Sequence, residues 1–137
     1  MYDSTLLNWS EDYRLGHARI DAQHQQLFKL LREMEQSIEQ CRGNETARKG
    51  LLALVDYSRY HFDAEEGHMR RLGYPGLAAH QQEHKGIINE IEHLLDEGKP
   101  VLTVELVYFV RRWLADHIIN SDMKIRDYQK TLANDDN

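Results

Sequence analysis

Apolar side chains recur at three- and four-residue steps along four separate stretches of this 137-residue chain. The first such stretch, near residues 19–41, contains Ile20, Leu27, Leu31, Met34 and Ile38. This spacing places side chains on one face of an α-helix, because an α-helix turns by about 100° per residue. The stretch therefore predicts an amphipathic helix with a single apolar stripe.

Three further stretches, near residues 44–72, 77–96 and 104–130, carry the same period. The segments between them contain both prolines and several glycines, residues that are typical of turns. These segments include Gly43-Asn44, Gly73-Tyr74-Pro75-Gly76 and Gly98-Lys99-Pro100. Short connections between helices of similar length favour antiparallel neighbours. The pattern predicts an all-α fold, an up-down-up-down antiparallel four-helix bundle.

The two ends of the chain lack a clear helical period. Residues 1–17 are predicted to form an N-terminal arm that packs on the bundle through Trp9 and Tyr13, and residues 131–137 form a polar tail. A chain of this length is one domain by the usual size range. We therefore expect a single domain over 1–137, with the bundle spanning 18–130.

Composition narrows the range of partners and compartments. The net charge of −6 argues against nucleic acid, and the basic doublets Arg70-Arg71 and Arg111-Arg112 are too small to follow a phosphate backbone. No apolar stretch approaches the roughly 20 residues of a membrane helix, and the N-terminus has no signal-peptide pattern. A single cysteine, Cys41, excludes an intrachain disulfide and fits a reducing compartment. The chain is expected to be cytoplasmic, without membrane insertion.

Seven potential metal ligands fall on the apolar faces of the four predicted helices. They are His24, His61, Glu65, His80, His84, His117 and Asp122. Nitrogen and oxygen donors without a cysteine suit iron, manganese or zinc. Because seven donors exceed what one such ion usually holds, the set predicts two metal ions.

A structural alternative exists for each histidine taken singly. One histidine on an apolar face is most often a core histidine that bonds to a backbone carbonyl. Five of them with two carboxylates are a different case, because burying an unpartnered carboxylate costs several kcal/mol. Metal ions would offset those costs together.

A ferritin-like di-iron site, built on two Glu-x-x-His strings, is a second alternative. The strings Glu65-x2-His68 and Glu90-x2-His93 both occur. Glu90 and His93 fall on the side of their helix away from the apolar stripe, and His68 lies about 80° from the centre of its own stripe. The ferritin-like pattern therefore fails. Glu66 also lies about 80° from that centre, so Glu65 is the better ligand candidate.

Three blocks of sequence resemble the hemerythrin family. The first, W-x3-Y-x2-G-x3-I-D-x2-H, spans residues 9–24. The second comprises H-F-x2-E-E-x2-M and Y-P-x4-H-x3-H between residues 61 and 84, and the third is W-L-x2-H-I-x3-D over 113–122. The resemblance covers most of the chain and implies a four-helix bundle with a non-haem di-iron centre (Fe2+/Fe3+) bridged by an oxo or hydroxo group.

The resemblance also implies how the ligands divide between the ions. One iron would be bound by His80, His84 and His117, the other by His24 and His61, with Glu65 and Asp122 as bridges. Counting bonds from these donors and the bridging oxygen fills all but one position of two octahedral ions. The open position falls on the iron with two histidines, where a small ligand enters.

Reversible O2 binding is the function that the resemblance implies, with O2 held as a hydroperoxide on the five-coordinate iron. The expected pocket around it consists of apolar side chains that admit O2 and hinder water, namely Leu27, Phe62, Trp113, Leu114 and Ile118. The expectation is a binding protein, not an enzyme, used for O2 storage or delivery or as the sensing domain of a larger signalling receptor. The alternative is a di-iron oxidase, a peroxidase or a nitric oxide-handling enzyme.

Overall fold

A computed structural model describes residues 10–39, 44–96 and 104–135, and within these ranges the chain is helical, without strands. Side chains at 37–39, 44–47, 94, 96, 104–108 and 134–135 are not described. The long helices are α1 (Ala18–Glu39), α2 (Asn44–Leu72) and α3 (Leu77–Asp96). The chain then continues without a break through α4 (Val104–Asp116), a six-residue π-helix (His117–Asp122) and α5 (Met123–Asp135).

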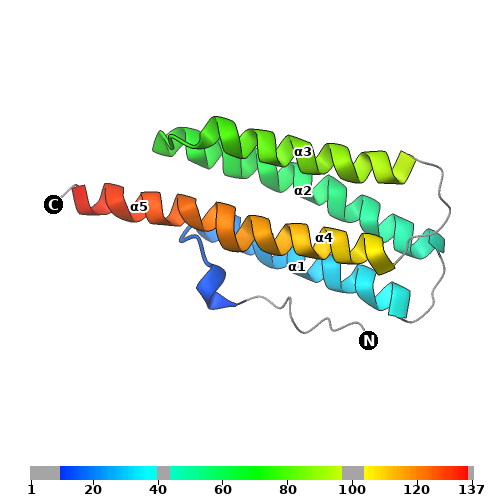
Figure 1. The fold of residues 1–137 in the computed structure, drawn as a ribbon. Helices are drawn as coiled ribbons and strands as arrows, with labels where there is room; N and C mark the ends of the chain where they lie inside the picture. Colours follow the sequence, from blue (N-terminus) through cyan, green and yellow to red (C-terminus); the bar gives the residue numbers. More distant parts are fainter. Residues whose placement is uncertain (1–9, 40–43, 97–103, 136–137) are drawn as a thin grey trace.

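These segments form the predicted antiparallel four-helix bundle. Figure 1 shows the chain running in alternating directions through α1, α2, α3 and the combined α4–α5 helix. The bounds of the first three helices agree with the periodic stretches to within two residues. The last helix ends at Asp135, five residues beyond the predicted end of the bundle at residue 130, so the first part of the predicted polar tail is helical.

Two glycines with positive φ angles shape the helix ends. Gly73 (φ 67°) follows α2, and its N–H donates to the carbonyl of Arg70 at 3.1 Å while that of Tyr74 donates to Met69 at 3.0 Å. This pair of bonds is a Schellman motif, which ends a helix at a glycine. Gly16 (φ 95°) precedes α1, and Asp21 accepts hydrogen bonds there from the N–H groups of Leu15 (2.6 Å) and Gly16 (3.2 Å).

The apolar interior is divided into two clusters. The larger cluster lies toward the end of the bundle where α1 finishes, and contains Leu31, Leu54, Ile91 and Leu114. The smaller cluster lies toward the other end and consists of Leu15, Ile20, Met69, Met123 and Ile125. On α1, α2 and the last helix the predicted metal ligands fall between residues of these two clusters. On α3 they fall between Ile87 of the larger cluster and the partly buried Leu77, which packs against the smaller one. The bundle therefore has a polar layer enclosed between two apolar ones.

The described part of the arm contacts α1 and α5 of the bundle. Tyr13 belongs to the short 3-10 helix Glu11–Tyr13, and its ring stacks on Phe28 with centroids 6.1 Å apart. Arg126 donates to the carbonyl of Asp12 at 3.1 Å, and Gln129 to that of Leu15 at 2.8 Å. The predicted packing of Tyr13 is thus confirmed, and Trp9 lies outside the described residues. None of the described helices is long and apolar enough to cross a membrane.

Candidate metal centre

The structure brings all seven predicted ligands together in the polar layer. Each of the four bundle helices contributes at least one of them, and none is more than 5% exposed. They are His24 on α1, His61 and Glu65 on α2, His80 and His84 on α3, and His117 and Asp122 at the two ends of the π-helix.

These donors form two groups that overlap. The ligand atoms within each group lie within 4.8 Å of one another. The first group is Glu65, His80, His84, His117 and Asp122, and the second is His24, His61, Glu65 and Asp122. Three histidines thus surround one point and two surround another, and both carboxylates belong to both groups. This is the division that the sequence resemblance implies for two metal ions.

The π-helix explains how His117 and Asp122 share a face. In a regular α-helix, residues five apart are separated by about 140°. A π-helix closes its hydrogen bonds between residues i and i+5, so residues five apart return to nearly the same side. His117 Nε2 and Asp122 Oδ1 accordingly lie 3.2 Å apart. The sequence prediction treated this segment as an α-helix and missed the π-helix.

Hydrogen bonds on the outer side of three imidazoles determine which ring nitrogen faces the centre. The Nδ1–H groups of His61, His84 and His117 donate to Gln23 (2.8 Å), Glu66 (2.9 Å) and Glu83 (2.8 Å) respectively. Each acceptor is an amide or carboxylate oxygen, so the proton of the neutral ring resides on Nδ1. The Nε2 lone pair of each ring is therefore directed inward.

The inward-facing atoms repel one another unless a cation or proton lies among them. The Nε2 atoms of His84 and His117 are 2.9 Å apart, although both are acceptors in the neutral rings. His61 Nε2 lies 3.0 Å from Glu65 Oε2 without forming a hydrogen bond, and neither oxygen of Asp122 has a hydrogen-bond partner in the part of the chain that the structure describes. Buried polar atoms without partners are rare and call for a ligand. The residues present fit a metal centre.

Several separations between neighbouring donors are compatible with binding to a common metal ion. Donors at right angles and about 2.1 Å from one ion lie about 3.0 Å apart. The distance is 3.0 Å from His24 to Asp122, 3.0 Å from His80 to Asp122 and 3.2 Å from His84 to Glu65. All of these are nitrogen or oxygen donors, which suits iron better than a metal that prefers thiolates.

The electrostatics of the buried donors show the same demand for positive charge. Burial lowers the pKa of His24, but the nearby carboxylates of Asp122 and Glu65 outweigh burial and raise this pKa to about 9. Burial lowers the pKa of His61, because its interactions with Glu65 do not fully compensate. For Glu65, burial favours the protonated form, but the surrounding histidines overcome it and hold the pKa well below its usual range. Glu65 therefore stays charged and attracts a cation.

The five predicted pocket residues all lie beside this centre or in the adjoining apolar cluster. Leu27, Leu114 and Ile118 are buried in the larger cluster, and Trp113 packs against it. The Phe62 ring stacks on His84 with centroids 3.8 Å apart and meets Trp113 edge-on at 5.7 Å. The indole Nε1–H of Trp113 is buried without a hydrogen-bond partner among the described residues.

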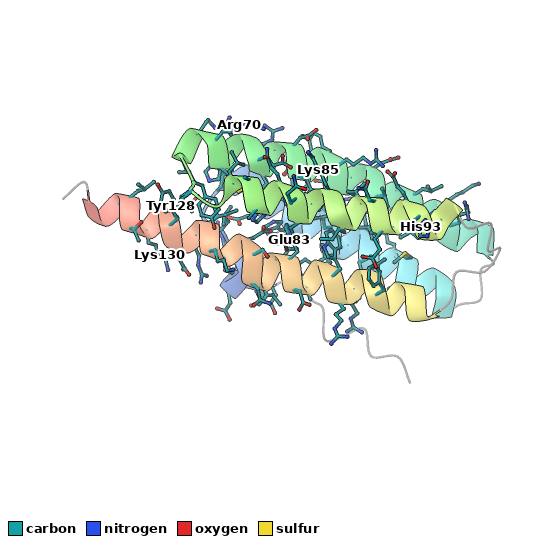
Figure 2. All side chains as sticks on the ribbon, turned by 45° about the horizontal axis from the view of Figure 1, so that its top comes forward. Arg70, Glu83, Lys85, His93, Tyr128 and Lys130 are labelled. Carbon is teal, nitrogen blue, oxygen red and sulfur yellow. The ribbon has the colours of Figure 1, made fainter. Side chains whose placement is uncertain are left out.

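The rejected alternatives lie away from the centre. Glu90 and His93 are exposed on the outer side of α3, where His93 is labelled in Figure 2. His68 is half-buried, donates to Gln129 and packs beside His17 with ring centroids 4.5 Å apart. The ferritin-like pattern is therefore absent from this bundle.

Three residues that support the ligands were missed by sequence reasoning, or were weighed for another role. Gln23 and Glu83 were not singled out, and Glu66 was considered only as a ligand. Glu83, labelled in Figure 2 on α3, accepts a hydrogen bond from Ser121 (2.7 Å) in addition to the one from His117. Bonding to His117 lowers the pKa of Glu83 to about 2, against a smaller opposing effect of burial. Each of the three is adjacent in sequence to a ligand, and this adjacency is the signal that could have found them.

Comparison with known proteins gives consistent matches over most of the chain. The profile of the Hemerythrin HHE cation binding domain matches residues 15–126. A bacteriohemerythrin of Stenotrophomonas maltophilia is 30% identical over 94% of this chain and 85% of its own length. A myohemerythrin of Riftia pachyptila is 29% identical over 86% of this chain and 89% of its own.

Solved structures agree with the sequence relatives. A wild-type hemerythrin crystal structure superposes with a TM-score of 0.78 at 28% identity, covering 85% of this chain and 92% of that one. A hemerythrin with an L114A substitution superposes with a TM-score of 0.81 at 26% identity, covering 90% and 96%.

Proposed function

Because this chain belongs to the hemerythrin family, we propose that it binds O2 reversibly at a pair of iron ions held in the polar layer of the bundle. The observation that carries the proposal is the pair of overlapping donor groups, which share Glu65 and Asp122. Seven buried donors are more than one ion usually coordinates, whereas two ions that share two carboxylates can coordinate all seven.

Each donor has a defined role in this proposal. His80, His84 and His117 would hold one iron and His24 and His61 the other, and Glu65 and Asp122, which belong to both donor groups, would serve both ions. Iron supplies the electrons and the binding position for O2, chemistry that these side chains do not provide. The carboxylates neutralise the charge of the ions, and the Nδ1 hydrogen bonds of three histidines keep their Nε2 atoms directed at the metals.

The apolar neighbours of the centre exclude water and protons from the bound O2. Leu27, Leu114 and Ile118 are each 1% exposed or less and carry no polar side-chain atom. Among the five predicted lining residues, Trp113 alone has such an atom, and an indole N–H donates a hydrogen bond without acting as an acid. Such walls favour release of O2 itself over release of partly reduced oxygen.

The lack of acid–base groups in this wall is also why we propose binding and not turnover. Oxidases, peroxidases and nitric oxide-handling enzymes need a group that delivers protons to reduced oxygen or nitrogen species. The five lining side chains contain no carboxylate or imidazole. Sustained turnover with a reductant and either peroxide or nitric oxide would favour the enzymatic alternative.

The test is an O2 titration of anaerobic, ferrous protein. We expect two irons per chain and a visible absorption band that develops with O2 and disappears on degassing. The band should return through at least several cycles of O2 and inert gas. Protein with one zinc or no metal, or O2 consumed without recovery of the ferrous form, would contradict the proposal.

The arm offers a route from this site to a signal, and we propose oxygen sensing as one use beside storage and delivery. Asp122 ends the π-helix, and α5 follows it directly and bonds to the arm through Arg126 and Gln129. A shift of Asp122 on O2 binding would thus reach the arm through one rigid helix. Hydrogen exchange in residues 10–16 should differ with and without O2 in a sensor and stay the same in a carrier. A sensor would have the rest of a cytoplasmic signalling receptor as its partner.

A further inference from the structure

Three of the histidines each donate their Nδ1–H to a residue of the preceding helix in the bundle. Gln23 on α1 accepts from His61 on α2, Glu66 on α2 from His84 on α3, and Glu83 on α3 from His117 on the last helix. Each partner is adjacent in sequence to a ligand of its own helix: His24, Glu65 and His84. One step along an α-helix turns by about 100°, so the neighbour of an inward-facing ligand faces the next helix.

The described residues show no hydrogen bond of this kind between the last helix and the histidine of α1. The position that follows His117 is the apolar Ile118, and His24 Nδ1 is buried without a hydrogen-bond partner in residues 10–39, 44–96 and 104–135. The consequence is an uneven distribution of charge. The group with three histidines has two carboxylate partners, Glu66 and Glu83, whereas the group with two has the neutral amide of Gln23.

We propose that Glu66 and Glu83 are positioning residues that make the three-histidine half of the centre the easier half to oxidise. A carboxylate that accepts a hydrogen bond from a metal-bound imidazole makes that ring a stronger donor, which favours the higher oxidation state of the metal. An amide acceptor orients the ring equally well but adds no negative charge. The first electron therefore leaves the three-histidine half and the second leaves the half where O2 enters. This inference rests on the proposed di-iron function.

Glu66 and Glu83 should not affect the oxidation of the three-histidine half equally. The side chain of Glu66 is 17% exposed and that of Glu83 is 39% exposed, so water screens Glu83 more strongly. The same oxygen of Glu83 that faces His117 also accepts from Ser121, which offsets part of its charge. Glu66 should have the larger effect of the two.

The experiment compares three substitutions that retain a side-chain oxygen and change only its charge. Glu66→Gln and Glu83→Gln remove a charge from the three-histidine half, and Gln23→Glu adds one to the other half. Two-step redox titration of each protein, followed by its visible spectrum, gives the midpoint for each electron. We expect Glu66→Gln to make the first oxidation harder, lowering the ferric-to-ferrous ratio at a fixed potential about tenfold, a change as large as the smaller effects of such partners on metal affinity.

Glu83→Gln should also make the first oxidation harder, but by less than Glu66→Gln. Gln23→Glu should make the second oxidation easier and leave the midpoint of the first nearly unchanged. Opposite signs for loss and gain of charge are not produced by a purely structural disturbance. Asp63→Asn is the matched control, because Asp63 lines the same surface groove as Glu66 and His84 but no described hydrogen bond joins it to a histidine.

Equal shifts in Asp63→Asn, or unchanged midpoints in both glutamine variants, would overturn the inference. If Glu66→Gln does not assemble, the direction of the Gln23→Glu shift still decides it. Wild-type protein without two redox-active irons would instead refute the proposed function, and the iron content of the wild type separates these two failures.

Discussion

The inward-facing imidazoles show how single side chains define the centre. His61 is fully buried, bonds outward to Gln23 and presents Nε2 to Glu65 at 3.0 Å. Apolar periodicity shows from the sequence which polar residues, such as His61, share the core face of a regular helix. Asp122 lies about 140° from His117 on a regular α-helix, so the family resemblance was needed to group the two as ligand candidates. The bonds to Gln23 and Glu83 were not accessible in the same way, since both depend on how closely neighbouring helices approach.

His61→Ala removes one of the two histidines in the smaller donor group. We expect iron content to fall from about two to about one per chain, because the remaining donors there are one imidazole and the shared carboxylates. Metal analysis and the O2-dependent band measure the loss, and circular dichroism checks that the helices persist. Tyr60→Phe, at the exposed preceding position, is the control and should keep both irons. Full iron content in His61→Ala would argue against this ligand.

Ile118→Glu tests the apolar wall beside the centre. Ile118 is fully buried, so a carboxylate there draws in water and protons and should accelerate autoxidation by about a hundredfold, the lower end of the scale for a single proton-transferring group. The rate is followed as loss of the O2-dependent band with time. Ile119→Glu is a matched control, since the next side chain is 39% exposed. Equal rates in the two variants would refute the water-excluding role.

At the scale of elements, the four periodic stretches predicted the bundle because each helix buries one stripe. The prediction failed where the local geometry departs from a uniform α-helix. Residues 117–122 are a π-helix, and α5 continues to Asp135 although Leu132 is the only large apolar residue after Tyr128, which is too few for a full stripe. A helix extending beyond the core needs no such stripe, so periodicity underestimates its length.

The π-helix should be a weak point of the metal-free protein. Its hydrogen-bond geometry is less favourable than that of an α-helix, and its two ends hold His117 and Asp122. A metal that binds both residues ties the segment at each end. Amide exchange across 117–122 should therefore slow on metal binding, about tenfold for each 1.4 kcal/mol of local stabilisation. The middle of α1 is the internal reference, and equal slowing there and in the π-helix would point to a global effect.

At the scale of the whole molecule, the metal layer separates two apolar clusters that each contain residues from several helices. The centre therefore occupies a position that most bundles fill with apolar side chains. Glu65 and Asp122 are both fully buried there and depend on charged or polar neighbours. The stability of the fold should consequently depend on metal or protons bound in the polar layer as well as on the two apolar clusters.

Removal of the metal should lower the stability of the entire bundle while leaving its topology intact. Without a cation, two buried carboxylates and five imidazoles must share protons, and each poorly compensated charge costs several kcal/mol. We expect the free energy of unfolding to fall by at least a few kcal/mol after iron is chelated, measured by urea denaturation at equal protein concentration. Readdition of ferrous iron should restore it, since binding to the native state alone stabilises that state. His61→Ala should lose less on chelation than the wild type, because it has fewer metal bonds to lose. A metal-free protein as stable as the loaded one would show that the two apolar clusters suffice, and that the polar layer is not a site on which folding depends.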